Sequence, residues 1–173
     1  MSESATSSVT VQPPESSFYQ RRRISRLPAV QALYQFEQTS GRIDVQDTSV
    51  KKILDEISLF HSAETFTEEV WMDMDEKYFH QLVHGTVLDC KALDAMISAC
   101  LVAGWRLNRL ESVVRAILRV GAYELKAMLG ITTAVLVNEY LDIAKAFFDG
   151  KEPAFVNGMM DSLARNLRAK KSQ

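Results

Sequence analysis

The chain has 173 residues, of which 47% are hydrophobic and 24% are charged, and its formal net charge is −2 at pH 7. This is the composition of an ordinary globular protein of one domain, and it excludes a chain coated evenly with positive charge for nucleic acid. No apolar run reaches the roughly 18 residues of a membrane span, and the first residues lack the apolar core of an export signal, so we expect a cytoplasmic protein.

Charge is distributed unevenly along the chain. Residues 1–42 contain 5 basic and 3 acidic residues, residues 43–100 contain 4 and 12, and residues 101–173 contain 11 and 7. An acidic middle between two basic ends favours a local cationic face, because exposed charges act only over a Debye length of about 8 Å. The two cysteines, Cys90 and Cys100, form no CxxC motif, which favours a reducing compartment.

The first elements are a tail and a helix. Residues 1–17 are rich in Ser and Thr and have little to bury, so we predict a flexible N-terminal tail. The first helix is predicted to begin at Ser25, a favourable N-cap, with Pro28 in its first turn. It carries an apolar stripe at helical spacing and ends at Ser40 and Gly41.

The acidic middle of the chain is also helical in pattern. Two stretches, 48–61 and 65–88, have acidic outer sides, and the second is predicted to open at Thr65 or Thr67. We expect Gly85 to interrupt it and to start a further helix over 86–102.

The last part of the chain has the clearest pattern. A wide apolar stripe over 109–129 predicts a central helix, and two more helices are predicted over 132–150 and 153–168. No segment shows the sustained alternation of a strand. The sequence therefore predicts an all-α domain of six to seven helices over 18–168, followed by a basic C-terminal tail over 169–173.

Motifs for catalysis are missing. The sequence contains no Gly-rich phosphate loop and no nucleophile elbow, so we expect no enzymatic activity and no cofactor. The spacing of Glu76, His80 and His84 puts three possible metal ligands on one helical face. Nothing fixes a fourth ligand, such as Cys90 or His61, so we favour an ordinary polar face and predict no metal site.

Four arginines precede the first apolar stripe, and they are named here the arginine cluster: Arg21, Arg22, Arg23 and Arg26. Adjacent like charges repel, and a helix N-terminus disfavours cations but attracts phosphate. Arginine also makes bidentate phosphate contacts and stacks on bases. These features point to RNA or DNA binding, and a solvated charge run stays the alternative.

A second candidate is the segment Phe155, Val156, Asn157 and Gly158, named here the FVNG segment. Phe155 and Val156 can simply be core residues, with Gly158 allowing another helix to approach closely. Alternatively, Phe155 and Asn157 present a ring and an amide to an unpaired nucleotide. We expect this segment to lie beside the arginine cluster on one surface.

Four blocks of sequence carry a family resemblance. These are RRRISRLPAVQALYQ, SVVRAILRVGAYEL, VNEYLDIAKAF and FVNGMMDSLAR, which follow one another over about residues 21–168. Together they resemble the NusB family of bacterial transcription antitermination factors. The resemblance implies two packed helical subdomains, no catalysis, and an adaptor that pairs with the small-subunit ribosomal protein NusE on single-stranded boxA RNA of ribosomal leaders. Contact with the RNA polymerase elongation complex would be indirect.

The resemblance also nominates residues. It places Arg22, Arg23, Arg26, Phe155 and Asn157 at the RNA. Arg21 joins them as part of the arginine cluster, and Lys151 is a nearby basic candidate. Near the protein partner or in its supporting helices, the resemblance places three further residues, Tyr34, Asn138 and Glu139.

Three alternatives stay open. The same fold serves as the RNA-binding domain of ribosomal RNA cytosine methyltransferases, although such an enzyme needs an α/β cofactor domain that this chain lacks. A helical adaptor that binds only proteins is the second alternative. The third is a homodimer, because a second copy can also cover an exposed apolar groove.

Overall fold

The structure is a computed structural model that describes residues 15–40, 73–127 and 131–171. Within these ranges the regular elements are all helices, which confirms the all-α prediction: α1 (Glu15–Ser40), α4 (Glu76–Leu88), α5 (Cys90–Cys100), the 3-10 helix η1 (Leu107–Arg109), α6 (Ser112–Ala127), α7 (Thr133–Phe147) and α8 (Glu152–Lys171). None of the helices in these ranges has the length and apolar character that a bilayer crossing requires.

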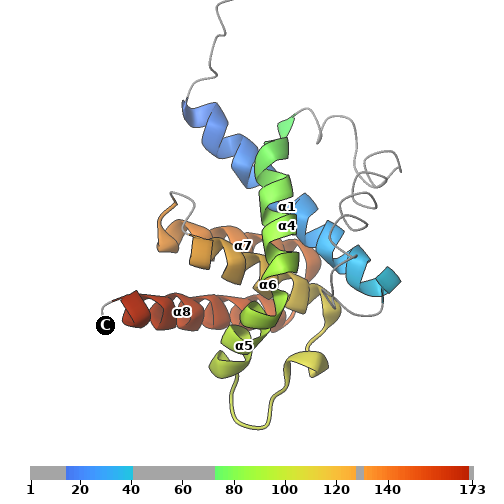
Figure 1. The fold of residues 1–173 in the computed structure, drawn as a ribbon, viewed down its shortest axis with the longest axis vertical. Coiled ribbons are helices and arrows are strands. Elements are labelled where there is room, and N and C mark those ends of the chain that lie inside the picture. Colours follow the sequence, from blue (N-terminus) through green and yellow to red (C-terminus); the bar gives the residue numbers. More distant parts are fainter. Residues whose placement is uncertain (1–14, 41–72, 128–130, 172–173) are drawn as a thin grey trace, which may run out of the picture.

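Helix α6 is the centre of the fold. It packs against α1, α4, α5, α7 and α8, while α1 also packs on α4 and α7 packs on α8 (Figure 1). Most of its length is buried, and its core side chains include Ile117, Leu118 and Val120, each with no exposed surface. The broad apolar stripe that predicted a central helix therefore reflects contact with neighbours on nearly every side.

Helix α1 begins ten residues earlier than predicted. It starts at Glu15, inside the predicted tail, and Pro28 lies in its interior. Ser25 is fully buried in the middle of the helix and is not an N-cap. Its hydroxyl accepts the N–H of Asp75 at 2.9 Å and lies 2.8 Å from the carbonyl oxygen of Arg21, so it joins α1 to the start of α4.

Helix α4 is bounded differently from the prediction. Asp75 caps it, because a carboxylate oxygen accepts the N–H of Tyr78 at 3.0 Å, and Asp89 ends it. Gly85 lies inside the helix and does not break it. The ring of Tyr123 occupies the place that a Cβ on Gly85 would take. The predicted helix over 48–61 and the predicted starts at Thr65 or Thr67 lie outside the described residues.

The two C-terminal helices are close to their predicted positions. Helix α7 follows Thr132 and ends at Phe147, and α8 runs from Glu152 into the predicted basic tail. Gly121 of α6 is the point of close approach, since a Cβ there would lie 2.7 Å from the side chain of Met160. Gly158 has nothing within 4 Å of the same position, so the expectation that it admits another helix is wrong.

Candidate nucleic-acid interface

The members of the arginine cluster point to different neighbours. The guanidinium of Arg21 donates to the carbonyl oxygen of Met74 at 3.0 Å. That of Arg22 lies 3.8 Å from the carboxylate of Asp75 and 4.5 Å from the ring centroid of Tyr78. Both side chains therefore stabilise the contact between α1 and the start of α4.

Arg23 faces helix α7 instead. Its side chain is 63% exposed, and its guanidinium lies 3.6 Å from a carboxylate oxygen of both Glu139 and Asp142. Ion pairs this exposed contribute little to stability, because water and salt screen them. Arg23 can therefore leave these carboxylates and bind another anion with little loss of folding free energy.

Arg26 is buried, with 2% of its surface exposed. It forms a bidentate pair with Glu124 of α6, at 3.0 Å from Nε and 2.7 Å from Nη2, and lies 3.4 Å from Glu139 of α7. Glu124 has no exposed surface and also accepts the hydroxyls of Tyr78 and Tyr140, the latter at 2.6 Å. This cluster joins four helices through one carboxylate.

The environment fixes the protonation states in this cluster. Burial lowers the pKa of Arg26, but the hydrogen bond and the charge of Glu124 outweigh burial, so the net pKa is raised. Burial raises the pKa values of Tyr78 and Tyr140, and the negative charge of Glu124 raises them further. The guanidinium therefore stays charged and both phenols stay neutral at pH 7.

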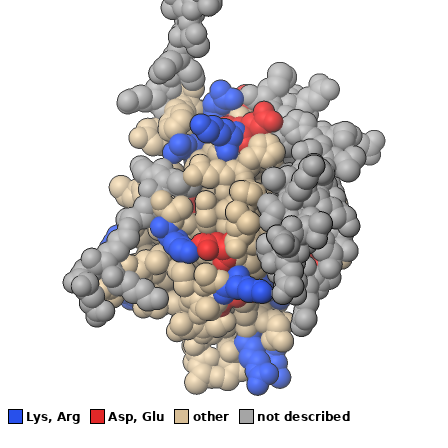
Figure 2. Space-filling model, viewed as in Figure 1, with Lys and Arg blue, Asp and Glu red and all other residues tan. Residues whose placement is uncertain are grey.

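These contacts correct two expectations. Arg26 holds α1 to α6 and α7 and has almost no surface to offer a phosphate, so we remove it from the RNA-binding residues. The arginine cluster also lies in the second to fourth turns of α1, not at its N-terminus, so the helix dipole gives no reason for an anion there. In Figure 2 several basic side chains on this face lie beside acidic ones, and uncharged surface lies between these groups.

The FVNG segment lies in the first two turns of α8. Val156 is fully buried, Asn157 is half-buried and Lys151 is exposed just before the helix. The half-buried ring of Phe155 stacks on Trp105, with ring centroids 5.8 Å apart and an angle of 28° between the planes. Trp105 is 60% exposed, so the segment adjoins an aromatic surface.

The two candidate regions do not pack on each other as expected. The arginine cluster contacts α4, α6 and α7, whereas Phe155 contacts the connection between α5 and α6. Figure 1 shows the first half of α1 at the upper end of the molecule and α8 across its lower part. An RNA that touched both would have to run along the surface between them.

The predicted partner residues lie on two helices. Tyr34 is 37% exposed on α1, and Asn138 is exposed on α7. Glu139 is occupied by the two arginines described above. Between α1 and α7 lies a groove of about 970 Å³, and the residues that line it include Leu27 and Asp142.

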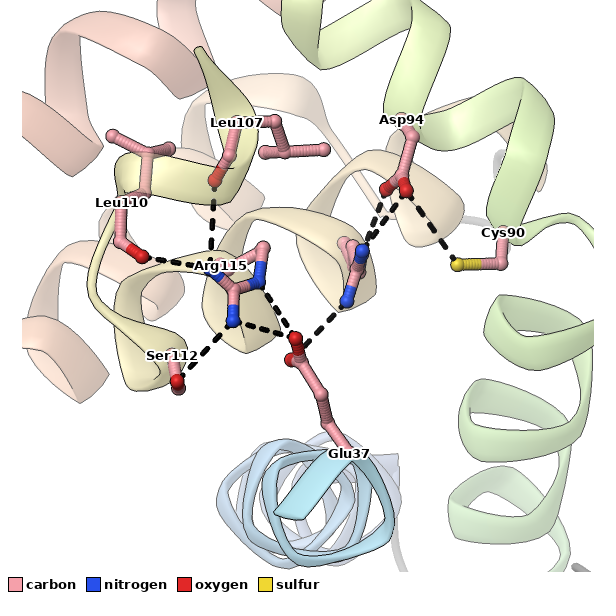
Figure 3. A network of polar contacts seen from close by, with 8 residues as sticks. Glu37, Cys90, Asp94, Leu107, Leu110, Ser112 and Arg115 are labelled. Carbon is pink, nitrogen blue, oxygen red and sulfur yellow. Dashed lines mark hydrogen bonds and ion pairs between the residues drawn. The ribbon is translucent and has the colours of Figure 1, made fainter. Parts of the chain in front are cut away.

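A second polar network holds the other end of α1 (Figure 3). Glu37 pairs with Arg115 at 2.5 Å and with Arg119 at 3.2 Å, and Arg119 forms a bidentate pair with Asp94 of α5. Beside it, burial raises the pKa of the Cys90 thiol to about 11. These ion pairs position α1, α5 and α6 and are too enclosed to bind a large ligand.

The possible ligands Glu76, His80, His84 and Cys90 are not assembled into a metal site, and His61 lies outside the described residues. Within the described part of the chain, no three side chains of His, Cys, Asp or Glu are grouped as a metal site requires. Glu76 and His80 do meet, with 3.6 Å between the carboxylate and Nε2, as an ordinary pair on an exposed helical face.

Trp105 is the residue that reasoning from the sequence missed. It follows Gly104, whose φ of +89° marks a sharp turn between α5 and η1, and it precedes Arg106. A tryptophan between a turn glycine and an arginine, outside any helical stripe, was the available signal. The Arg26–Glu124 pair was also missed, because 98 residues separate the partners and no local pattern connects them.

Comparisons with known proteins agree with this fold. A model of the NusB family matches residues 23–165. Proteins named transcription antitermination protein NusB, from Brucella ovis and from Brucella suis biovar 1, are 43% identical over 148 residues, which is 86% of this chain and 82% of theirs.

Solved structures give the same picture. T. maritima NusB is 31% identical, with a TM-score of 0.62 over 83% of this chain and 90% of that one. A structure of antitermination factors NusB and NusE in complex with double-stranded RNA is 20% identical and has a TM-score of 0.62, over 84% of this chain and 97% of that chain. The similarity to this second structure shows that the fold is shared.

Proposed function

Since this chain belongs to the NusB family, we propose that it is a transcription antitermination factor. It is an RNA-binding adaptor that assembles with the ribosomal protein NusE on boxA RNA of ribosomal leaders and promotes read-through by RNA polymerase, which it contacts indirectly. The observation that carries this proposal is the 43% identity to NusB proteins over most of both chains. The function is one of assembly and not of catalysis, and it is exercised in the cytoplasm as a single domain.

The RNA surface is built from exposed cations and from the start of α8. Arg21 and Arg23 have the exposure that phosphate contacts need, while Arg22 supports them from the contact with α4. Phe155 and Asn157 supply a ring and an amide for bases. Lys151 adds a charge one turn before Phe155, since the N–H of Phe155 donates to its carbonyl oxygen.

The protein partner is NusE, as in the solved complex of NusB, NusE and RNA that shares this fold. The surface proposed for it includes Tyr34 and Asn138, with Glu139 as a support whose carboxylate is held by arginines. A second copy of the chain competes for exposed apolar surface, so a homodimer is the alternative assembly of the free protein. Light scattering with and without NusE distinguishes the two.

A double substitution of exposed arginines tests the RNA surface. We expect Arg21→Gln with Arg23→Gln to weaken boxA binding and to make its dependence on salt shallower by about 0.7 in log–log slope per lost phosphate contact. The measurement is a titration of labelled leader RNA at two or more salt concentrations, with NusE present.

The matched control is Arg165→Gln, which removes an exposed arginine from the far half of α8. It should keep the slope of the unsubstituted protein, and circular dichroism should show equal helicity in all three proteins. If the unsubstituted protein with NusE binds leader RNA no better than a scrambled RNA, the proposed function is wrong. An unchanged slope in the double variant alone would remove Arg21 and Arg23 from the RNA surface.

A further inference from the structure

We propose that Trp105, backed by the ring of Phe155 and flanked by Arg106 and Arg109, is a stacking platform for an unpaired RNA base. The name stacking platform is used below for the Trp105–Phe155 pair. This inference rests on the proposed function, because it assigns a base-binding element to the same RNA.

The position of the tryptophan is the first observation. Trp105 lies in the short connection between α5 and η1 and exposes 60% of its surface, although a large aromatic ring is normally well buried. One face is held by Phe155, which is anchored at the start of α8 beside the buried Val156. The ring is therefore held in place but still presents much of its surface to solvent.

The charge of the segment that carries the ring is the second observation. Residues 101–109 include Arg106 and Arg109 and no acidic residue, and both arginines are exposed. In the part of the chain that the structure describes, neither guanidinium has a carboxylate within ion-pair distance, unlike those of Arg22, Arg23 and Arg26. Lys151 adds less net positive charge, because Asp149 and Glu152 flank it in sequence.

This combination favours a nucleotide over a protein surface. Every base offers a flat π face, whatever the RNA sequence. Stacking on an aromatic side chain is therefore a common way to bind single-stranded RNA. The phosphates on either side of a stacked base can then bind the exposed guanidiniums of Arg106 and Arg109. Protein interfaces also use Trp and Arg, and the titrations below distinguish RNA from a protein partner.

Removal of the ring tests the platform. We expect Trp105→Ala to weaken binding of boxA RNA by NusE-bound protein about fivefold to a hundredfold, the range for loss of one stacked base. Trp105→Phe should retain most of the affinity, because a flat ring remains. Val102→Ala is the matched control, since Val102 is 75% exposed in the same connection and is not aromatic.

Salt dependence separates the ring from its charged neighbours. Trp105→Ala should keep the log–log salt slope, because a stacking contact releases no counterions, whereas Arg106→Gln should make the slope shallower by about 0.7. If the role of Trp105 were purely structural, Trp105→Ala would instead have a lower melting temperature, and its loss of affinity would not be separable from a change in salt slope. Equal melting temperatures of Trp105→Ala and Val102→Ala are therefore part of the expected result.

Tryptophan fluorescence reports contact directly. The chain has two tryptophans, so Trp71→Phe leaves Trp105 as the only one. Titration of this variant with boxA RNA should quench its emission, and titration with NusE alone should not. Quenching by NusE alone, with RNA affinity unchanged in Trp105→Ala, would assign the ring to the protein partner and overturn the proposal.

The two levels of inference fail in different ways. If the unsubstituted protein binds leader RNA specifically and Trp105→Ala binds it equally well, the platform is wrong and the proposed function stands. If the unsubstituted protein shows no specific RNA binding, the proposed function itself is wrong.

Discussion

At the residue scale, the same side-chain type serves opposite purposes within six positions of α1. Arg23 is exposed beside carboxylates that it can leave, whereas Arg26 is enclosed with Glu124 and two phenols. Sequence alone treats them as one cluster, because the burial of Arg26 depends on residues of α4, α6 and α7. The position of an arginine, and not its presence in a run, decides whether it can serve a ligand.

The buried pair gives the first prediction on stability. Arg26→Met should lower the free energy of unfolding by about 3–5 kcal/mol, because it leaves the carboxylate of Glu124 buried without its cation. Urea unfolding followed by circular dichroism measures the change. The double variant Arg26→Met with Glu124→Gln keeps an acceptor for the phenols but removes the buried charge, and it should recover much of the loss. An Arg26→Met protein as stable as the parent would contradict the role given to this pair.

At the element scale, the helices were predictable where their signals are local. The apolar stripes located α6, α7 and α8, and the first stripe located the second half of α1. The start of α1 was missed, because Ser25 looks like an N-cap and is in fact buried against Asp75. In the same way Gly85 looks like a helix break, but it serves contact with Tyr123, which lies 38 residues away. Local patterns therefore predict where the helices are, but they do not predict the tertiary contacts of Ser25 and Gly85.

The candidate site was predictable to a smaller extent. Phe155, Asn157 and Arg23 follow from family motifs and Arg21 from the run of arginines, and the structure puts them on accessible or half-exposed surface. Trp105 has no such motif and becomes visible only when the fold brings it onto Phe155. The expected adjacency of the arginine cluster and the FVNG segment failed for a related reason: α6 packs against both α1 and α8, and no sequence pattern reports which face of a central helix each neighbour takes.

Two glycines inside helices give a matched prediction. Gly85→Ala should destabilise the protein, because its Cβ would overlap the ring of Tyr123. Gly158→Ala meets open space in a helix interior and should stabilise the protein by about 0.5–1 kcal/mol. Thermal or urea unfolding of the two variants measures both changes. Equal effects of the two substitutions would show that α4 and α6 do not meet at Gly85.

At the scale of the whole molecule, buried groups with raised pKa values make the free energy of unfolding depend on pH in the alkaline range. The pKa of Cys90 is raised from 9.0 to about 11, and those of the two buried phenols, Tyr78 and Tyr140, are raised as well. Between pH 9 and 11, the Cys90 thiol has lost its proton in the unfolded chain but keeps it in the folded chain, and the buried phenols likewise keep their protons to higher pH in the folded chain. The free energy of unfolding therefore falls as pH rises above about 9, since its slope follows the difference in bound protons.

Unfolding in urea at pH 8, 9.5 and 11 measures this dependence. Stability should be constant up to about pH 9 and then decline. Cys90→Ser removes the contribution of the thiol and should make the decline between pH 9 and 11 less steep, while the part due to the phenols persists. A parent protein whose stability rises over this interval would contradict the burial of these groups.

The junction between α1 and α4 has a practical consequence for every titration proposed above. The Ser25 hydroxyl is buried, and the backbone N–H of Asp75 that it accepts is neutral, so dissolved ions screen this hydrogen bond far less than they screen surface charge pairs. Raising the ionic strength should thus weaken attachment to a polyanion while the helices stay docked. A shift in affinity between dilute and concentrated buffer then measures released counterions and not a loosened protein.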